Sequence, residues 1–313
     1  MWQDWWSRKD ADARRLFPPE CESGKAAKQR LLECLHQPPE NFKHEQSRWS
    51  LQALLENCDW LQLKTLSGLW RLLDRLGISY KRARDYLHSP DREYEAKVTY
   101  IQQSLQQTLR QPERYALLYL DEFGFERQPT LSWAYTERGT ALPLAQRSHR
   151  TNTICRGIGA LNALTGQLTY EQHSKINLPC LSNFYQHLTD AYHWAESIFV
   201  VQDNWPVHVH PDILARLQPQ ISPFCPTVPA NWPTAPTRRA VQDTLPIQLV
   251  FLPTYSPWLN PIEQLWRWVR QDVLHLHRFS DDWLTLKQRV LDFMARFSAA
   301  STDLLNFVGL LPS

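Results

Sequence analysis

The chain has 313 residues, which at roughly 150 residues per domain suggests about two domains. Only 9 residues are glycine, and the sequence contains neither a Gly-x-Gly-x-x-Gly nor a Gly-Lys-Ser/Thr motif, which disfavours a nucleotide-binding fold. Lys and Arg number 34 against 32 acidic residues, and the net charge of +2 neither requires nor excludes a polyanionic partner. We find no secretory signal and no apolar run near the roughly 20 residues that cross a bilayer. We therefore expect a soluble, intracellular protein without a membrane partner.

Two helices and a basic stretch stand out in the first third of the chain. Leucines at helical spacing predict helices at 50–59 and 66–76, and Gly77 is placed to stop the second. From Lys64 to Arg84 the chain carries six cations against one acid, Asp74. The six candidate DNA contacts are Lys64, Arg71, Arg75, Lys81, Arg82 and Arg84. A helix-turn-helix needs such a basic face to reach DNA phosphates, but a solvated helical bundle can also carry one, so both interpretations stay open.

The rest of the chain alternates between apolar strands and helices, after a polar helix at 94–110 that is typical of a linker. We predict strands at 115–120, 132–136, 153–161, 168–172, 197–201 and 247–252, and helices at 181–196, 212–217 and 261–275. Three hairpin-like strands followed by alternating helix and strand predict a mixed sheet with helices on its faces. Residues 219–246 contain seven prolines and interrupt the pattern, so we interpret them as an insertion or a long loop.

Carboxylates follow two of the predicted buried strands. Asp121 comes directly after the strand at 115–120, and Asp203 follows the strand at 197–201. The carboxyl ends of neighbouring strands border the ligand crevice of an open sheet, and paired carboxylates there suit Mg²⁺. Glu263, at the start of the helix after the third buried strand, is the candidate third ligand. Each acid also has a plain interpretation, since Asp is common in turns and Asn260 with Glu263 could form a capping box.

Three sequence blocks resemble a known family. They are LDEFGF with Trp133 and Gly139 downstream, then VQDNWPVH, and then FLPTYSPWLNPIEQLWRWVR. Together they resemble the DDE transposases of the mariner superfamily, in its bacterial insertion-sequence branch. Upstream, RWSLQALL, residues 66–78 and SPDREYEAK are similar to the DNA-binding half of that family. The resemblance covers about residues 40–290.

The resemblance implies a two-part organisation. An α/β RNase H-like catalytic domain at 113–313, with a mixed five-stranded sheet flanked by helices, would follow an N-terminal tail (1–40), an all-α helix-turn-helix region (41–92) and a linker helix (93–112). The implied protein binds double-stranded DNA at the terminal inverted repeats of its element, cuts it and transfers the ends to target DNA. It would work as a homodimer at the bacterial nucleoid, in the cytoplasm.

The resemblance also implies roles for individual residues. The catalytic and metal-binding acids would be Asp121, Asp203 and Glu263. They would hold two Mg²⁺ ions, for which Mn²⁺ can substitute, to activate water and then the freed 3′ hydroxyl. Four further polar residues would lie around the metals or the scissile phosphate: Glu122, Asn204, His208 and Asn260. A surface, core or capping role stays open for these four.

Two departures from the family pattern keep alternatives open. Asp203 and Glu263 are 60 positions apart, a longer gap than is usual in the family, and the proline-rich segment 219–246 accounts for the excess. The first forty residues do not resemble the additional helix-turn-helix that many relatives carry. A catalytically inactive or regulatory DNA-binding protein, or a general RNase H-like nuclease, therefore stands beside the transposase.

Overall fold

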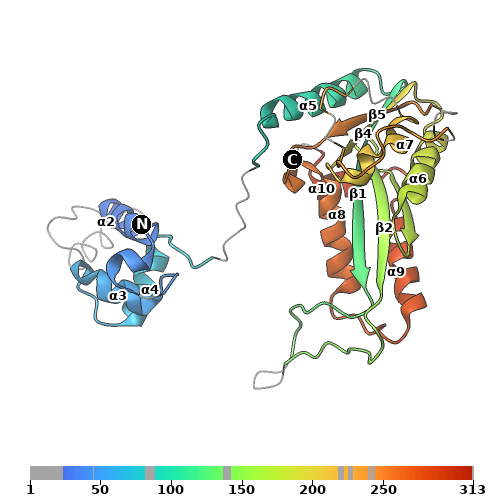
Figure 1. The fold of residues 1–313 in the computed structure, drawn as a ribbon. Helices are drawn as coiled ribbons and strands as arrows, with labels where there is room; N and C mark the ends of the chain where they lie inside the picture. Colours follow the sequence, from blue (N-terminus) through green and yellow to red (C-terminus); the bar gives the residue numbers. More distant parts are fainter. Residues whose placement is uncertain are drawn as a thin grey trace, which may run out of the picture. The chain divides into compact units, whose positions relative to one another are not determined.

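The computed structural model describes residues 24–44, 46–81, 89–136, 142–217, 222–224, 228–238, 240 and 244–311. The chain folds into two compact units, and the boundary between them lies between residues 85 and 86 (Figure 1). None of the helices that the structure describes combines the length and the apolar character that a membrane span requires.

The first unit is a small all-helical core. It contains α2 (Gly24–Leu35), α3 (Leu51–Asn57) and α4 (Leu66–Arg75), with single 3₁₀ turns at Pro39–Phe42 and Asp59–Leu61. The helices predicted at 50–59 and 66–76 are confirmed as α3 and α4. The side chains of Ser50 and Thr65 cap their N-termini, and Gly77 follows α4 with a φ of 67°. Helix α2 precedes residue 41, where we expected the helical region to begin, and it packs Ala27 and Leu31 into the core of this unit.

The second unit is built on the predicted mixed sheet. Its five strands are β1 (Tyr115–Glu126), β2 (Ile154–Asn162), β3 (Leu168–His173), β4 (Ser197–Gln202) and β5 (Ile247–Phe251), in the order β3-β2-β1-β4-β5. The pairs β1–β2 and β2–β3 are antiparallel, and the pairs β1–β4 and β4–β5 are parallel. The prediction of a strand at 132–136 was wrong. Within the described residues this stretch pairs with no strand, and Trp133 and Tyr135 are almost fully exposed.

Helices cover both faces of the sheet (Figure 1). On one face lie α5 (Tyr94–Arg110), α8 (Ile262–Val269) with one π-helical turn after it (Arg270–Leu274), α9 (Trp283–Ala295) and α10 (Thr302–Val308). On the other lie α6 (Leu178–Ala191), the 3₁₀ turn Pro206–Val209 and the short helix α7 (Pro211–Leu214). Alternate side chains of β1 enter the two cores, Leu117 and Tyr119 on the first face, Leu118 and Leu120 on the second. The described parts of 219–246 carry turns and irregular chain, as predicted.

A buried ion pair fastens the loop that leads into α8. The carboxylate of Asp91 accepts hydrogen bonds at 2.9 Å from the backbone N–H of Thr254 and from Nζ of Lys97, and both charged side chains are nearly buried, 7% and 8% exposed. Burial alone would raise the pKa of Asp91, but the hydrogen bonds from Thr254 and Lys97 outweigh it and lower the pKa to about 2. The start of α5 therefore holds this loop in place.

We expect Asp91→Asn to lower the free energy of unfolding by about 3 kcal/mol at pH 7, because Lys97 is left buried without its counter-charge. Since the folded pKa of Asp91 lies below its unfolded value, the contribution is present above pH 4 and is lost as the pH falls toward 2. Urea unfolding of both proteins at pH 7 and pH 3.5 measures this. An equal difference at the two pH values would contradict the prediction.

Candidate active site

Asp121 lies inside β1, at the point where this strand loses one of its two neighbours. Parallel pairing with β4 ends at Tyr119 and Val201, whereas antiparallel pairing with β2 continues to Glu126. We expected the strand to end at residue 120. It continues because Phe123 and Phe125 keep burying one face of the strand against the helices. The other acids of the site lie near Asp121, at the edge of β1 that β4 leaves unpaired.

Asp203 directly follows β4, as predicted. Its side chain is exposed, and Oδ1 accepts a hydrogen bond of 2.9 Å from the backbone N–H of Trp205. This is the turn chemistry that we expected as the plain interpretation. Because β1 and β4 are parallel neighbours, both acids lie at the same edge of the sheet, and the charge of Asp203 acts on Asp121.

Glu263 lies in the first turn of α8 without taking part in a capping box. The helix has no side-chain cap, and Nδ2 of Asn260 donates instead to the backbone oxygen of Leu120 at 3.1 Å. This bond ties the loop before α8 to the residue that precedes Asp121. The carboxylate of Glu263 is thereby left to interact with Asp121.

The environment of Asp121 disfavours a negative charge. Burial raises the pKa of this carboxyl to about 8, together with the charges of Glu263, Glu122 and Asp203, in that order. The indole N–H of Trp266 opposes the rise, since it donates to Oδ2 of Asp121 at 2.8 Å. A carboxylate in such a place needs a proton or a cation beside it.

Glu263 has positive neighbours as well as negative ones. Burial raises the pKa of its carboxyl, and the guanidinium groups of Arg270 and Arg267 offset part of that rise. Glu263 in the first turn of α8 thus feels both the acids of the site and the two arginines at the end of this helix. Oxygen ligands gathered in this way are the donor set that Mg²⁺ prefers.

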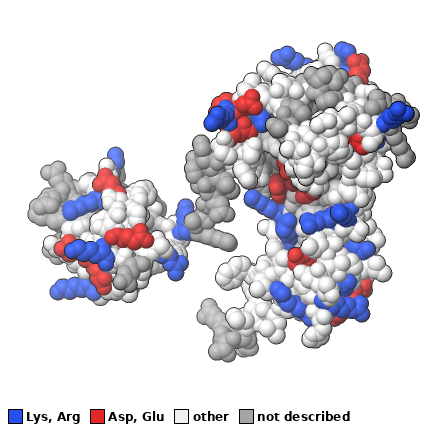
Figure 2. All heavy atoms as spheres, in the orientation of Figure 1, with Lys and Arg blue, Asp and Glu red and all other residues white. Residues whose placement is uncertain are grey.

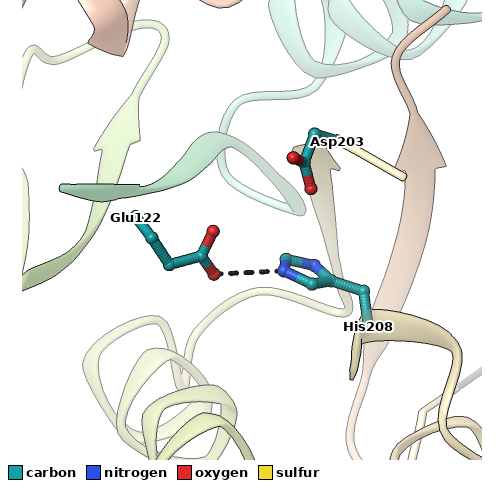
Figure 3. Close-up of side chains that lie close together, drawn as sticks. All are labelled: Glu122, Asp203 and His208. Atoms are coloured by element: carbon teal, nitrogen blue, oxygen red, sulfur yellow. Dashed lines mark hydrogen bonds and ion pairs between the residues drawn. The ribbon is translucent and has the colours of Figure 1, made fainter. Parts of the chain in front are cut away.

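A second group of ligand atoms lies on the other face of β1 (Figure 3). Glu122 alternates with Asp121 along the strand, and its Oε1 lies 3.1 Å from Nε2 of His208, which is buried. With Asp203 these residues offer ligand atoms that all lie within 4.8 Å of one another. Asp203 belongs to this group, and its charge also acts on Asp121 and on Glu263.

Several polar atoms at the site are buried without a protein partner among the described residues. They are Nδ1 of His208, Oδ1 of Asn204 and Oδ1 of Asn260. The other atom of the Asn204 amide, Nδ2, donates to the backbone oxygen of Leu252 at 2.8 Å and so ties the ends of β4 and β5. Because buried polar atoms are normally satisfied, these three fit a site that is completed by water, a metal ion or a ligand.

Three residues that shape the site were not predicted from the sequence. Trp266 hydrogen-bonds Asp121, and Arg267 and Arg270 act on Glu263. The spacing of Trp266 and Arg267 carried a usable signal, because residues three and four positions after Glu263 on a helix lie next to it. The resemblance drew attention to Trp266 only as part of a motif.

The predicted DNA-binding residues lie in the first unit. Lys64, Arg71, Arg75 and Lys81 are exposed, whereas Arg82 and Arg84 lie outside the described residues. Arg71 and Arg75 lie four positions apart on α4, and Nε of Arg75 donates to the backbone oxygen of Arg71 at 3.3 Å. Figure 2 shows Lys and Arg interspersed with Asp and Glu on the visible face of this unit, so that face carries both charges.

We expect Asp121→Asn to stabilise the metal-free protein at pH 8. The folded pKa of Asp121 lies above its unfolded value, so folding takes up a proton and stability falls as the pH rises from about 4 to 8. Asn is neutral at every pH and can still accept the indole N–H. Calorimetry in the presence of a chelator should show a melting temperature higher by on the order of 5 °C at pH 8, and a smaller difference at pH 5. Asp292→Asn, on the exposed face of α9, is the control, and a pH-independent difference for Asp121→Asn would refute the prediction.

The chain is similar to proteins of mobile DNA. A family model described as the DDE superfamily endonuclease matches residues 116–287. The chain is 21% identical over 311 residues to the insertion element IS630 uncharacterized 39 kDa protein of Shigella sonnei, a match that covers 95% of this chain and 79% of that protein.

Solved structures give the same picture for the fold. The Mos1 mariner paired-end complex with Mg matches with a TM-score of 0.57 at 16% identity, covering 94% of this chain and 75% of that chain. The Mos1 strand transfer complex matches with a TM-score of 0.51 at 16% identity, covering 90% and 73%. These matches confirm the predicted fold of a mixed five-stranded sheet flanked by helices.

The matched region contains Asp121, Asp203 and Glu263 and makes up more than half of the chain. The resemblance noticed in the sequence is confirmed at the level of the family. The chain belongs to the DDE superfamily endonuclease family.

Proposed function

We propose that this chain is a transposase that binds the terminal inverted repeats of its own element, cuts the DNA there and joins the freed end to target DNA. The observation that carries the proposal is the convergence of three carboxylates from separate elements: Asp121 in β1, Asp203 after β4 and Glu263 in α8. The similarity to an insertion-element protein and to transposase complexes supports it. A substrate of this kind puts the activity at the nucleoid, in the bacterial cytoplasm.

Asp121, Asp203 and Glu263 are the residues that would hold two divalent ions, Mg²⁺ or Mn²⁺. Such ions, when bound, activate the attacking hydroxyl and stabilise the leaving oxygen in phosphodiester chemistry. The raised pKa of Asp121 supports this assignment, because a cation relieves the charge that burial and the neighbouring acids disfavour. Mos1 complexes solved with Mg and with Mn are further support.

The remaining polar residues would hold neighbouring side chains and backbone in position. His208 holds Glu122 beside Asp203 through its contact with Oε1, so Glu122 keeps one orientation at the edge of the site. Asn260 and Asn204 fix the backbone at Leu120 and Leu252, on either side of the acids. On the visible face of the sheet unit, Lys and Arg side chains border a small acidic group (Figure 2). This pattern suits a DNA backbone lying across carboxylates.

The helical unit would bind the ends of the element. Its helices α3 and α4 are joined through the 3₁₀ turn Asp59–Leu61, and α4 presents Trp70, Arg71 and Arg75 to solvent. We assign α4 as the recognition helix of a helix-turn-helix, with Lys64 and Lys81 as further residues that bind phosphates. Arg82 and Arg84 belong to the same proposal by sequence.

The protein would act on paired DNA ends as a homodimer. The connection between β1 and β2 carries five large apolar side chains, each at least 73% exposed: Leu131, Trp133, Tyr135, Leu142 and Leu144. Apolar side chains gathered in one exposed segment are characteristic of an interface. A second copy of the chain is the occupant that a paired-end reaction requires.

Cleavage of a DNA that carries the element's own ends tests the catalytic proposal. We expect Mg²⁺-dependent nicking that Asp203→Ala reduces by about 10³-fold or more, because the variant lacks a metal ligand. Asp292→Ala, an exposed acid on α9, should cleave like the wild type. Unchanged cleavage by Asp203→Ala would sink the proposal. Binding without nicking would indicate a regulatory protein, and nicking without end preference or strand joining would indicate a general nuclease.

Salt-dependent binding tests the role of α4. We expect the double variant Arg71→Ala/Arg75→Ala to bind the ends more weakly. The slope of log K against log salt should also fall by roughly 1 for each DNA phosphate that the variant no longer neutralises. Lys25→Ala on α2 removes an exposed cation of the same unit and serves as the control. Equal slopes for the double variant and the wild type would exclude a role for these arginines in binding phosphates.

A further inference from the structure

Trp266 directly contacts Asp121, the acid of the site whose pKa is raised to about 8. It lies on α8, three residues after Glu263, and its side chain is 2% exposed. The indole Nε1 donates a hydrogen bond of 2.8 Å to Oδ2 of Asp121. Oδ2 of Asp121 is therefore occupied by the indole, and the other side chain that hydrogen-bonds this carboxyl is that of a second acid, Glu263.

The indole ring is locked by its surroundings. It stacks on Phe123, with ring centroids 5.1 Å apart and planes 16° from parallel, and the centroid of the Tyr170 ring lies 6.3 Å away. Phe123 follows Asp121 by two residues and so lies on the same face of β1. The ring that binds Asp121 and the strand that carries Asp121 are thus packed as one body.

Gly159 makes room for this ring. In the antiparallel register Gly159 of β2 lies directly opposite Asp121. A Cβ atom at this position would lie 2.7 Å from Cη2 of Trp266 and 3.3 Å from Cδ1 of Ile262. An aromatic ring in a close-packed core cannot yield to such a contact without moving. Any larger residue at 159 would displace the donor from Asp121.

We propose that Trp266 is a positioning residue for Asp121: its N–H holds Oδ2, so the carboxylate presents Oδ1 to the divalent ion, and Gly159 provides the space that this arrangement needs. The inference rests on the proposed function, in which Asp121 binds metal. Hydrogen bonds to the distant oxygen of a ligating carboxylate orient it in this way at metal sites.

Mn²⁺ binding to the full-length protein, followed by the loss of the free-ion EPR signal, tests the proposal without DNA. Trp266→Phe keeps an aromatic ring and removes the N–H, and we expect about 10- to 100-fold weaker Mn²⁺ binding. Trp268→Phe is the matched control. It lies on the same helix and removes an indole bond of the same length, 2.8 Å, to Asp272, so its Mn²⁺ affinity should equal that of the wild type.

Gly159→Ala gives a second route to the same effect. We expect weaker Mn²⁺ binding here too, although every indole atom is retained. Gly124→Ala, in the adjacent strand, is the control, because its Cβ would meet only the flexible end of Arg156, at 2.9 Å from Nη1. Thermal unfolding of each variant shows that a folded protein is being compared.

NMR of the wild-type protein and of Asp121→Asn covers the case in which neither Trp266→Phe nor Gly159→Ala folds. The indole N–H resonance that shifts most in Asp121→Asn should also shift on addition of Mg²⁺. Absence of any indole resonance that responds to both changes would overturn the proposal.

Asp121→Ala separates this inference from the function on which it rests. If Asp121→Ala loses Mn²⁺ binding while Trp266→Phe binds like the wild type, Trp266 is not a positioning residue. If Asp121→Ala itself binds Mn²⁺ like the wild type, the assignment of Asp121 as a metal ligand fails, and the inference falls with it.

Discussion

The burial of Asp121 beside three other acids, at the unpaired edge of β1, is the constraint around which the sheet unit is organised. Burial and, after it, the charges of Glu263, Glu122 and Asp203 raise the pKa of Asp121 to about 8, a cost to the metal-free fold. Such strain persists only where the surrounding structure fixes each partner. A site that holds acids together against their repulsion is ready to bind a divalent ion, since the ion relieves what the fold has to resist.

Hydrogen bonds between side chains and backbone fix the chain where it enters the site. Asn260 bonds the backbone just before Asp121, Asn204 bonds the end of β5, and Asp91 anchors the loop that leads to Glu263. These hydrogen bonds fix the backbone, while Trp266 contacts the carboxylate of Asp121 itself. The apolar cores on both faces of the sheet then keep β1 from shifting between its neighbours.

Sequence patterns predicted most elements of the sheet unit, because continuous apolar runs such as 197–201 and 247–251 are buried on both faces whatever their neighbours. They misplaced the end of β1, since pairing with β2 beyond residue 120 is a long-range property that no local pattern carries. The false strand at 132–136 had apolar residues at strand spacing, but its side chains are exposed. Asp121, Asp203 and Glu263 were predicted through their positions and the family resemblance, and their role as metal ligands stays a prediction. The contact of Trp266 with Asp121 depends on helix packing and could not be predicted from spacing alone.

Anomalous diffraction from crystals grown with Mn²⁺ would locate the ions directly. The electrostatics of the site predict peaks between the carboxylates of Asp121, Asp203 and Glu263, with Oδ1 of Asp121 as a ligand and Oδ2 still bonded to Trp266. Peaks found only among Glu122, Asp203 and His208, with Asp121 free of metal, would contradict this assignment of the catalytic centre.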